Sequence, residues 1–168
     1  DSTDGWTTTS DAIETWTDGD QGHSGDGGFV ELDDDAIDHY DDATNIMRDF
    51  PTQEGATYTL TFEYSPRPGY DADVNAFEFR VDGESLGSLA PDGSGNSDNV
   101  WESHTVTFIG TGEPMSLEFR TTGEAEDYGR GIRLDDIGLT ETLPASADES
   151  VVEYPLDITS SLTDTDGS

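Results

Sequence analysis

An alternation of apolar and polar residues at every second position is the feature of this sequence that most constrains its fold. In TYTLTFEY (57–64), the two tyrosines, Leu60 and Phe62 share one face of an extended strand, and the threonines and Glu63 share the other. Side chains of a strand point alternately to opposite faces, so such a segment buries one face and leaves the other in water. No long amphipathic helix is predicted anywhere in the chain.

The same alternation recurs along the chain, with turn residues about every 8 to 12 residues. The further strands that it predicts are FVEL (29–32), AFEFRVDG (76–83), ESHTVTFIG (102–110), MSLEFRTTG (115–123) and IRLDDIGLTET (132–142), with a short one between Trp6 and Trp16 and a hairpin over 81–89. Residues 33–50 are predicted to form an irregular excursion. About seven or eight short antiparallel strands indicate an all-β, two-sheet sandwich of the jelly-roll type.

The length of 168 residues corresponds to one domain with one hydrophobic core. The composition changes after GLTETLP, where a polar hinge and a Thr/Asp/Ser-rich tail follow. We therefore expect a β-sandwich ligand-binding module over 1–143, and a linker and lead-in to a following module over 144–168. Within this second part, 151–158 is a candidate extra strand of the sandwich.

The charge of the chain restricts its partners. The formal net charge is −33, with six arginines, no lysine and no cysteine. This charge excludes nucleic acid and anionic membrane as main electrostatic partners, and no apolar run is long enough for a membrane-spanning helix. Molar salt would screen the acids, and calcium would neutralise them by coordination. Many acids stand in turns beside Gly and Asn, which favours calcium, and the two explanations are compatible.

The corner PRPGYDADVN (66–75) is a candidate calcium loop. Its two prolines and its glycine fix a bend, after which Asp71, Asp73 and Asn75 present oxygens at alternate positions. Calcium takes six to eight such oxygens and accepts backbone carbonyls among them. The alternative is a solvated acidic turn. The acid-rich segment 31–42 is likewise interpreted as a solvated face that screens an edge strand.

Arg67 and Tyr70 in this corner are candidate ligand-binding residues. Arg67 either pairs with a carboxylate or clamps the hydroxyls or carboxylate of a ligand, with Tyr70 as a stacking face. In the loop DGSGNSDNVW (92–101), Asn96, Asp98 and Asn99 are candidates for binding sugar hydroxyls or calcium, although a plain hairpin connection explains this loop equally well.

Several segments in a fixed order carry a resemblance to a known class of module. These segments are GWTTTSDAIETW (5–16), GGFVELD (27–33), GATYTLTFEYSPRPG (55–69), FRVDG (79–83), WESHTVTF (101–108), LEFRTTG (117–123) and LDDIGL (134–139). Together they resemble the galactose-binding-type jelly-roll modules of giant bacterial RTX adhesins and other secreted surface proteins. The resemblance implies a non-catalytic, calcium-containing β-sandwich with a ligand site at one end or edge.

The segment GEAEDYGRGIRLDD (123–136) supplies the remaining candidates. Asp127 is a candidate metal ligand and Tyr128 a candidate ligand-binding residue. If Asp136 shares the core side with Leu134, its carboxylate is buried and needs a metal or a cationic partner. The resemblance implies that this aspartate serves a structural calcium, and an Arg or backbone partner is the alternative.

The function expected from the sequence is that of a calcium-dependent adhesion module within a large extracellular protein of a bacterial cell surface. Carbohydrate is the expected ligand, and the free C-terminal carboxylate of a protein or peptide is the alternative. A third possibility is a structural spacer that calcium rigidifies. No nucleophile and base pair stands out, so we expect no enzymatic activity. The module is expected to be a monomer within a longer chain.

Overall fold

The computed structural model describes residues 5–9, 13–16, 28–32, 44–122 and 130–144, together with the backbone of 151–154. All the structural statements below concern these residues. The elements of this part of the chain are strands, as the sequence predicts. They are β1 (Glu14–Trp16), β2 (Phe29–Glu31), β3 (Asn45–Phe50), β4 (Thr57–Ser65), β5 (Phe77–Val81), β6 (Glu84–Leu89), β7 (Glu102–Ile109), β8 (Met115–Thr121), β9 (Arg133–Thr142) and β10 (Val151–Tyr154).

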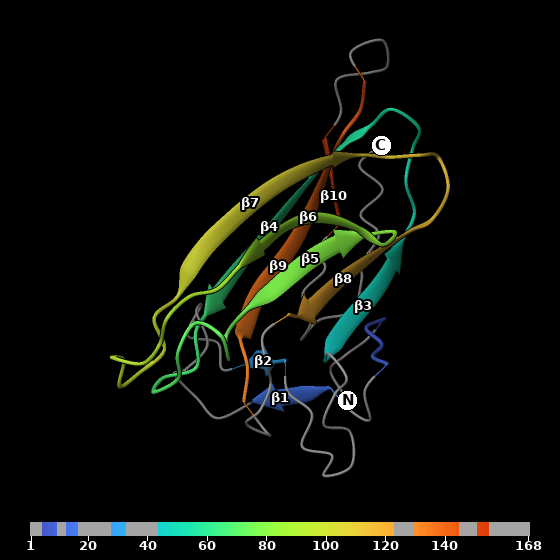
Figure 1. Cartoon of the computed structure of the whole chain (residues 1–168). Coiled ribbons are helices and arrows are strands. Elements are labelled where there is room, and N and C mark those ends of the chain that lie inside the picture. Colours follow the sequence, from blue (N-terminus) through green and yellow to red (C-terminus); the bar gives the residue numbers. More distant parts are fainter. Residues whose placement is uncertain are drawn as a thin grey trace.

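The strands form two antiparallel sheets that pack face to face (Figure 1). The smaller sheet has the order β3-β8-β5-β6, and the larger one has the order β1-β2-β9-β4-β7. The edge of β9 that faces away from β4 is shared, because β2 pairs with its first residues and β10 with Leu139–Thr142. The predicted all-β, two-sheet sandwich is confirmed. No helix of the described residues is long and apolar enough to cross a membrane.

The core lies between the sheets and is built largely from aromatic side chains. Tyr58, Leu60 and Phe62 of β4 are fully buried, as their alternation with threonine predicts. The Phe62 ring lies edge-on to Phe79 at 5.2 Å and to Phe119 at 5.0 Å between ring centroids. Both of these partners belong to the smaller sheet, so aromatic contacts join the two sheets at their centre.

β3 corrects the prediction of an irregular excursion over 33–50. Residues 45–50 form a regular strand that pairs with β8 along its whole length, and Ile46 and Phe50 point into the core. The aspartates that precede this strand conceal its period in the sequence. Its stability comes from pairing with β8, a contact distant in sequence that a local pattern does not reveal.

A β-bulge in β9 corrects the expectation for Asp136. Thr61 lies opposite Gly138 and Glu63 opposite Asp135, so β9 holds one more residue than β4 between these pairs. Asp136 takes a positive φ of 48° and its side chain is exposed. Alternation is interrupted here, because an extra residue shifts the strand by one position. The condition that Asp136 shares the buried side with Leu134 is therefore not met.

Candidate functional site

Two loops at one end of the sandwich are joined through their backbones. The amide of Gly69 donates to the carbonyl of Gly93, and the amide of Gly93 donates to the carbonyl of Tyr70, both at 2.8 Å. A Cβ atom on Gly93 would lie 2.4 Å from the carbonyl oxygen of Arg67, so only glycine permits this approach. The corner after β4 and the loop before β7 therefore act as one support for the side chains they carry.

The buried amide of Asn75 fixes the corner 66–75 from inside. Its Oδ1 accepts the backbone amide of Arg67 at 2.8 Å, and its Nδ2 donates to the carbonyls of Tyr70 and Asp71 at 3.1 and 2.9 Å. Asn75 is fully buried. This network sets the backbone of the two residues whose side chains, those of Arg67 and Tyr70, reach the end of the sandwich.

The carboxylate of Glu31 bridges two arginines. It accepts from Nη1 of Arg67 at 2.6 Å with one oxygen and from Nε of Arg133 at 2.8 Å with the other. The Glu31 side chain is completely buried, whereas that of Arg67 is 23% exposed. Glu31 and Arg133 are also direct partners in the β2–β9 pairing. The bridge holds both guanidinium groups in fixed positions, which two charge-assisted hydrogen bonds favour.

Aromatic rings surround Arg133. Its guanidinium carbon lies 5.6 Å from the centre of the Trp16 ring and 5.0 Å from that of Phe29. Trp16 stacks on Phe29 at 5.9 Å, and Trp101 meets Phe29 edge-on at the same distance. Nη1 of Arg133 also donates to Oδ1 of Asn99 at 2.5 Å. Three loops or short strands thus converge on one cation.

A second cation–aromatic group lies at the same end. The half-buried ring of Tyr70 has the guanidinium carbon of Arg67 at 5.6 Å and that of Arg130 at 4.8 Å. We call this whole group the arginine–aromatic end. Its members are Trp16, Phe29, Glu31, Arg67, Tyr70, Asn99, Trp101, Arg130 and Arg133.

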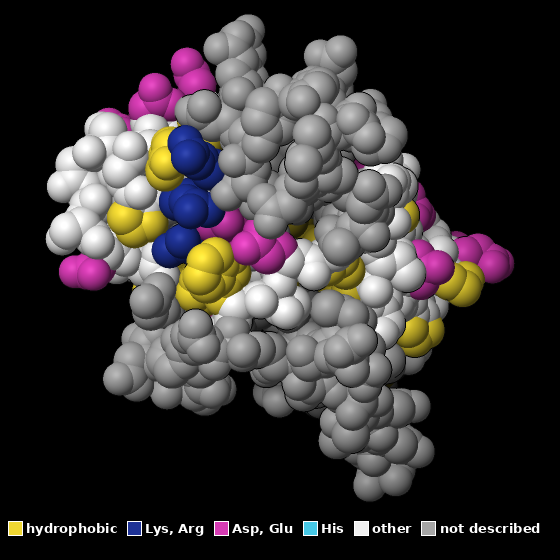
Figure 2. All heavy atoms as spheres, turned by 90° about the horizontal axis from the view of Figure 1, so that it is seen from below, with side chains coloured by type: hydrophobic (Ala, Val, Ile, Leu, Met, Phe, Trp, Pro, Cys, Tyr) yellow, Lys and Arg dark blue, Asp and Glu magenta, His cyan; other side chains and the backbone are white. Residues whose placement is uncertain are grey.

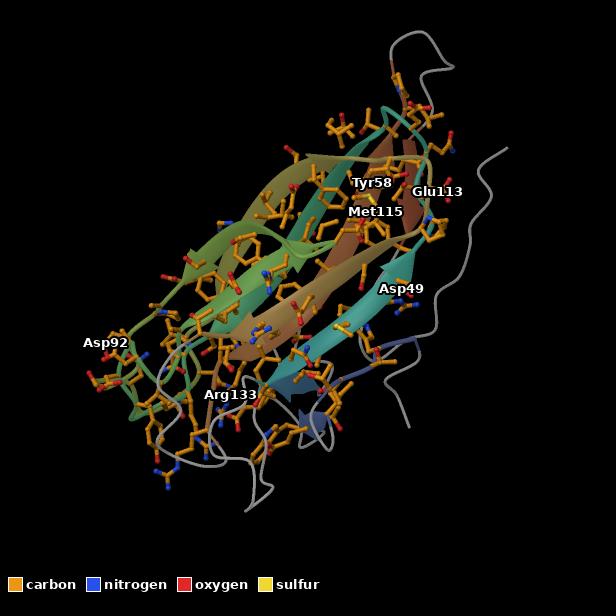
Figure 3. All side chains as sticks on the ribbon, turned by 45° about the vertical axis from the view of Figure 1, so that its right-hand side comes forward. Asp49, Tyr58, Asp92, Glu113, Met115 and Arg133 are labelled. Atoms are coloured by element: carbon orange, nitrogen blue, oxygen red, sulfur yellow. The ribbon has the colours of Figure 1, made fainter. Side chains whose placement is uncertain are left out.

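The arginine–aromatic end concentrates positive charge in an acidic protein, because it holds three of the six arginines of a chain whose net charge is −33. Figure 2 shows basic side chains gathered beside hydrophobic and acidic ones on the face seen from below. In Figure 3, Arg133 and Asp92 lie toward this end, and Tyr58, Met115 and Glu113 lie toward the other.

The structure brings together two of the predicted ligand-binding residues, Arg67 and Tyr70. The Arg67 guanidinium forms the predicted ion pair with a carboxylate and also lies over the Tyr70 ring. Asn96 and Asp98 lie in the loop that leads to Asn99, where the amide of Asn96 donates to the carbonyl of Gly93 and Oδ2 of Asp98 accepts from the hydroxyl of Ser97. Tyr128 lies outside the described residues. Binding of a ligand by any of these residues stays a prediction.

Three of the residues predicted to bind metal stand in the corner 66–75. Asp71 and Asp73 are exposed, and Oδ1 of Asp71 accepts the amide of Val74 at 3.3 Å. Asn75 uses its oxygen within the corner, and Asp127 lies outside the described residues. The described part of the chain gathers no group of three or more His, Asp or Glu side chains that could hold a metal ion. Calcium binding stays a prediction.

The sequence pattern does not single out Glu31 or Arg133. Glu31 stands at the head of the acid-rich segment that predicts a solvated face, yet its side chain is fully buried. Arg133 is the first residue of a strand, and nothing in the local sequence distinguishes it from an ordinary polar residue. The scarcity of arginine is the sequence feature that could have indicated them, because each of the few arginines in so acidic a chain is a candidate partner for a buried acid.

A family comparison places the chain. The model of the MAM domain (meprin/A5/mu) matches residues 1–143, which include β1 to β9 and the arginine–aromatic end. The chain belongs to the MAM domain family. No curated protein sequence matches this MAM domain significantly.

Solved structures with the same fold include binding modules. A family 35 carbohydrate-binding module from Clostridium thermocellum is 12% identical, with a TM-score of 0.51, and the match covers 80% of this chain and 90% of that one. Another, from an environmental isolate, is 15% identical with a TM-score of 0.52, covering 89% and 90%. The K1 cleaved adhesin domain of Lys-gingipain from Porphyromonas gingivalis is 16% identical with a TM-score of 0.53, covering 80% and 89%. These galactose-binding-like jelly rolls share the fold of this MAM domain.

Proposed function

We propose that this MAM domain is a non-catalytic binding module that takes carbohydrate at the arginine–aromatic end. The observation that carries the proposal is the buried carboxylate of Glu31, which holds Arg67 and Arg133 in place beside aromatic rings. Ligand sites combine apolar and aromatic walls with a few fixed polar groups. Guanidinium groups donate in a fixed geometry, and an aromatic face accepts the apolar face of a sugar ring.

Preorganisation is the physical advantage of this arrangement. An arginine side chain that is already ordered loses little conformational freedom when a ligand arrives, so more of the interaction energy appears as affinity. Asn75 and the contact between Gly93 and the corner order the backbone under Arg67 and Tyr70 in the same way. The fold that this domain shares with carbohydrate-binding modules and adhesin domains supports the same proposal.

Calcium dependence and an adhesive role at a bacterial cell surface, in a longer RTX-type protein, belong to the proposal as well. Calcium dependence rests on the acids that stand in turns and on the net charge of −33. The adhesive role and the RTX-type context rest on the resemblance of the ordered segments to modules of such adhesins. Calcium would neutralise carboxylates that repel one another, and a partly coordinated ion would bind vicinal hydroxyls directly.

A glycan array tests the carbohydrate proposal when it is probed with calcium and with chelator. We expect binding of a defined set of glycans, which Arg67→Ala and Tyr70→Ala weaken. Arg80→Ala is the matched control, because Arg80 lies on the smaller sheet and pairs with Glu78 and Glu118. If the three variants bind glycans equally well, the placement of the site is contradicted.

The peptide alternative is favoured by the arginines, whose planar fork matches a carboxylate. Peptides that carry free or amidated C-termini separate it from the first proposal, because amidation removes the charge that an arginine would recognise. A domain that binds neither ligand class, but melts at a higher temperature with calcium, is the spacer of the third possibility.

A further inference from the structure

Two guanidinium groups converge on one aromatic ring at the arginine–aromatic end. The guanidinium carbon of Arg130 lies 4.8 Å from the centre of the Tyr70 ring, and that of Arg67 lies 5.6 Å from it. The π face of a tyrosine attracts each cation, whereas the two cations repel each other. A negatively charged group of a ligand, placed beside this ring, would attract both of them.

The carboxylate that belongs to this group lies beneath the surface. The Glu31 side chain has no exposed area, whereas that of Arg67 is 23% exposed, and Tyr70 and Arg130 are half-buried. Glu31 also serves Arg67 and Arg133 together, so these three side chains carry two positive charges and one negative charge. A ligand that approaches this end therefore meets guanidinium groups and an aromatic ring before it meets the carboxylate.

The polar groups around the buried part of this end are mainly hydrogen-bond donors. A guanidinium carries five N–H donors and an indole carries one, and neither has an acceptor. The indole Nε1 of Trp16, beside Arg133, is buried, and no described residue accepts a hydrogen bond from it. Because buried donors are nearly always paired, this nitrogen is a separate indication that the arginine–aromatic end suits a ligand rich in acceptor oxygens.

Exposed aspartates limit how much negative charge such a ligand can carry. Asp71 and Asp73 stand in the corner after β4, Asp92 and Asp98 stand in the loop before β7, and all four are exposed. At physiological ionic strength the screening length is about 8 Å, so a bound charge is affected by its contacts and near neighbours far more than by the net charge of the whole chain. One anionic group held by the guanidinium groups is favoured, whereas further charges along the ligand would meet these aspartates.

We propose that the ligand of the arginine–aromatic end is a glycan that carries one acidic sugar in an otherwise neutral chain. This inference rests on the proposed carbohydrate function and adds the charge of the ligand to it. The carboxylate or sulfate ester of the acidic sugar accepts hydrogen bonds from Arg67 and Arg130 beside the Tyr70 ring. Charge-assisted hydrogen bonds to a guanidinium are stronger than those to a neutral donor and fix the orientation of the bound oxygens.

Matched pairs of glycans, printed as an array and probed with the whole chain, test this inference. Each pair consists of a glycan with one acidic sugar and the same glycan made neutral, by reduction of the carboxylate in one set and by removal of the sulfate in the other. We expect the acidic member to bind about tenfold more tightly or better, in chelator as well as in calcium, because the contact comes from arginine. The set that shows this preference identifies the anionic group.

The variant Arg130→Gln locates the anionic contact, because Arg130 stands outside the bridge that Glu31 makes. We expect the preference for the acidic member to fall about tenfold, and Arg130→Lys, which keeps the charge, to retain part of it. Arg80→Gln is the matched control and should leave the preference intact, since Arg80 lies on the smaller sheet. Melting temperatures of the three variants establish that each one folds.

The outcomes separate this inference from the proposed function. Equal binding of both members of every pair, weakened by Tyr70→Ala, would overturn the acidic sugar and leave the carbohydrate site standing. Tighter binding of a heparin fragment, which carries many charges, than of any glycan with one acidic sugar would also overturn it, and so would a preference that folded Arg130→Gln leaves unchanged. A chain that binds no glycan of the array contradicts both this inference and the proposed function.

Discussion

The buried carboxylate of Glu31 accepts a hydrogen bond from Nη1 of Arg67 at 2.6 Å, and this contact joins β2 to the corner after β4. The second oxygen of the same carboxylate binds Arg133. Glu31→Gln removes the charge that both guanidinium groups contact, and breaking such a buried pair costs about 3 kcal/mol or more. We expect this loss in the free energy of unfolding measured by chemical denaturation.

The matched control for this prediction is Glu78→Gln. Glu78 pairs with Arg80 at 3.6 Å on the outer face of the smaller sheet, where both side chains are more than a fifth exposed. Surface pairs of this kind contribute about 1 kcal/mol or less. Equal losses for the two variants would contradict a stabilising role of the Glu31 bridge.

The variant Asn75→Asp tests whether Asn75 stabilises the corner 66–75 from inside or serves as a metal ligand. The amide nitrogen of Asn75 donates to two carbonyl oxygens, and a carboxylate oxygen in its place would repel them. We expect a loss of about 2 kcal/mol or more, from the missing bonds and from the burial of a charge. The melting temperature, measured with and without calcium, checks this. A calcium ligand would behave oppositely, since the added carboxylate would then raise stability in calcium.

The joined loops at the arginine–aromatic end predict a contrast between two glycines. A Cβ atom on Gly93 would lie 2.4 Å from the carbonyl oxygen of Arg67, whereas one on Gly95 meets nothing within 4 Å. Gly93→Ala should therefore cost about 2 kcal/mol through overpacking and weaken ligand binding. Gly95→Ala should change neither property. Thermal melts and ligand titrations of the two variants measure the contrast.

Tyr64 predicts a loss of stability at alkaline pH. Burial raises the pKa of its phenol from 10.0 to about 12, helped by the hydrogen bond to Glu102 and by the charges of Glu102 and Glu63. Between these two values the folded chain keeps a proton that the unfolded chain has lost. The contribution of this proton to the free energy of unfolding is complete below pH 10, and it declines by about 1.4 kcal/mol per pH unit as the pH rises toward 12.

Denaturant titrations of the wild type and of Tyr64→Phe at several pH values above 9 isolate this contribution. The variant lacks the phenol, and its partner Glu102 is exposed and remains hydrated. We expect the stability difference between the two proteins to shrink as the pH rises above 10. A constant difference across this range would show that Tyr64 titrates alike in the folded and unfolded chains.

Local alternation was sufficient to predict the long strands. β4, β5, β7 and β8 follow from segments in which every second residue is apolar, because one face of each strand must be buried. β3 was not predicted because aspartates precede it in the sequence. Its alternation of buried and exposed residues is explained only by its pairing with β8. The sequence could not decide on which side of its strand Asp136 lies, because a bulge is a property of two paired strands and not of one segment.

The sequence by itself determined that this chain buries alternating faces in an all-β sandwich and that its corner 66–75 is bent and carries Arg67 and Tyr70. Only the tertiary structure decided that Glu31 is buried between Arg67 and Arg133. The reason is that strand alternation depends on neighbours in the sequence, whereas a charge bridge depends on which strands and loops meet at one end of the sandwich. That meeting is set by sheet order, which brings β2 beside β9 and the corner after β4 over both.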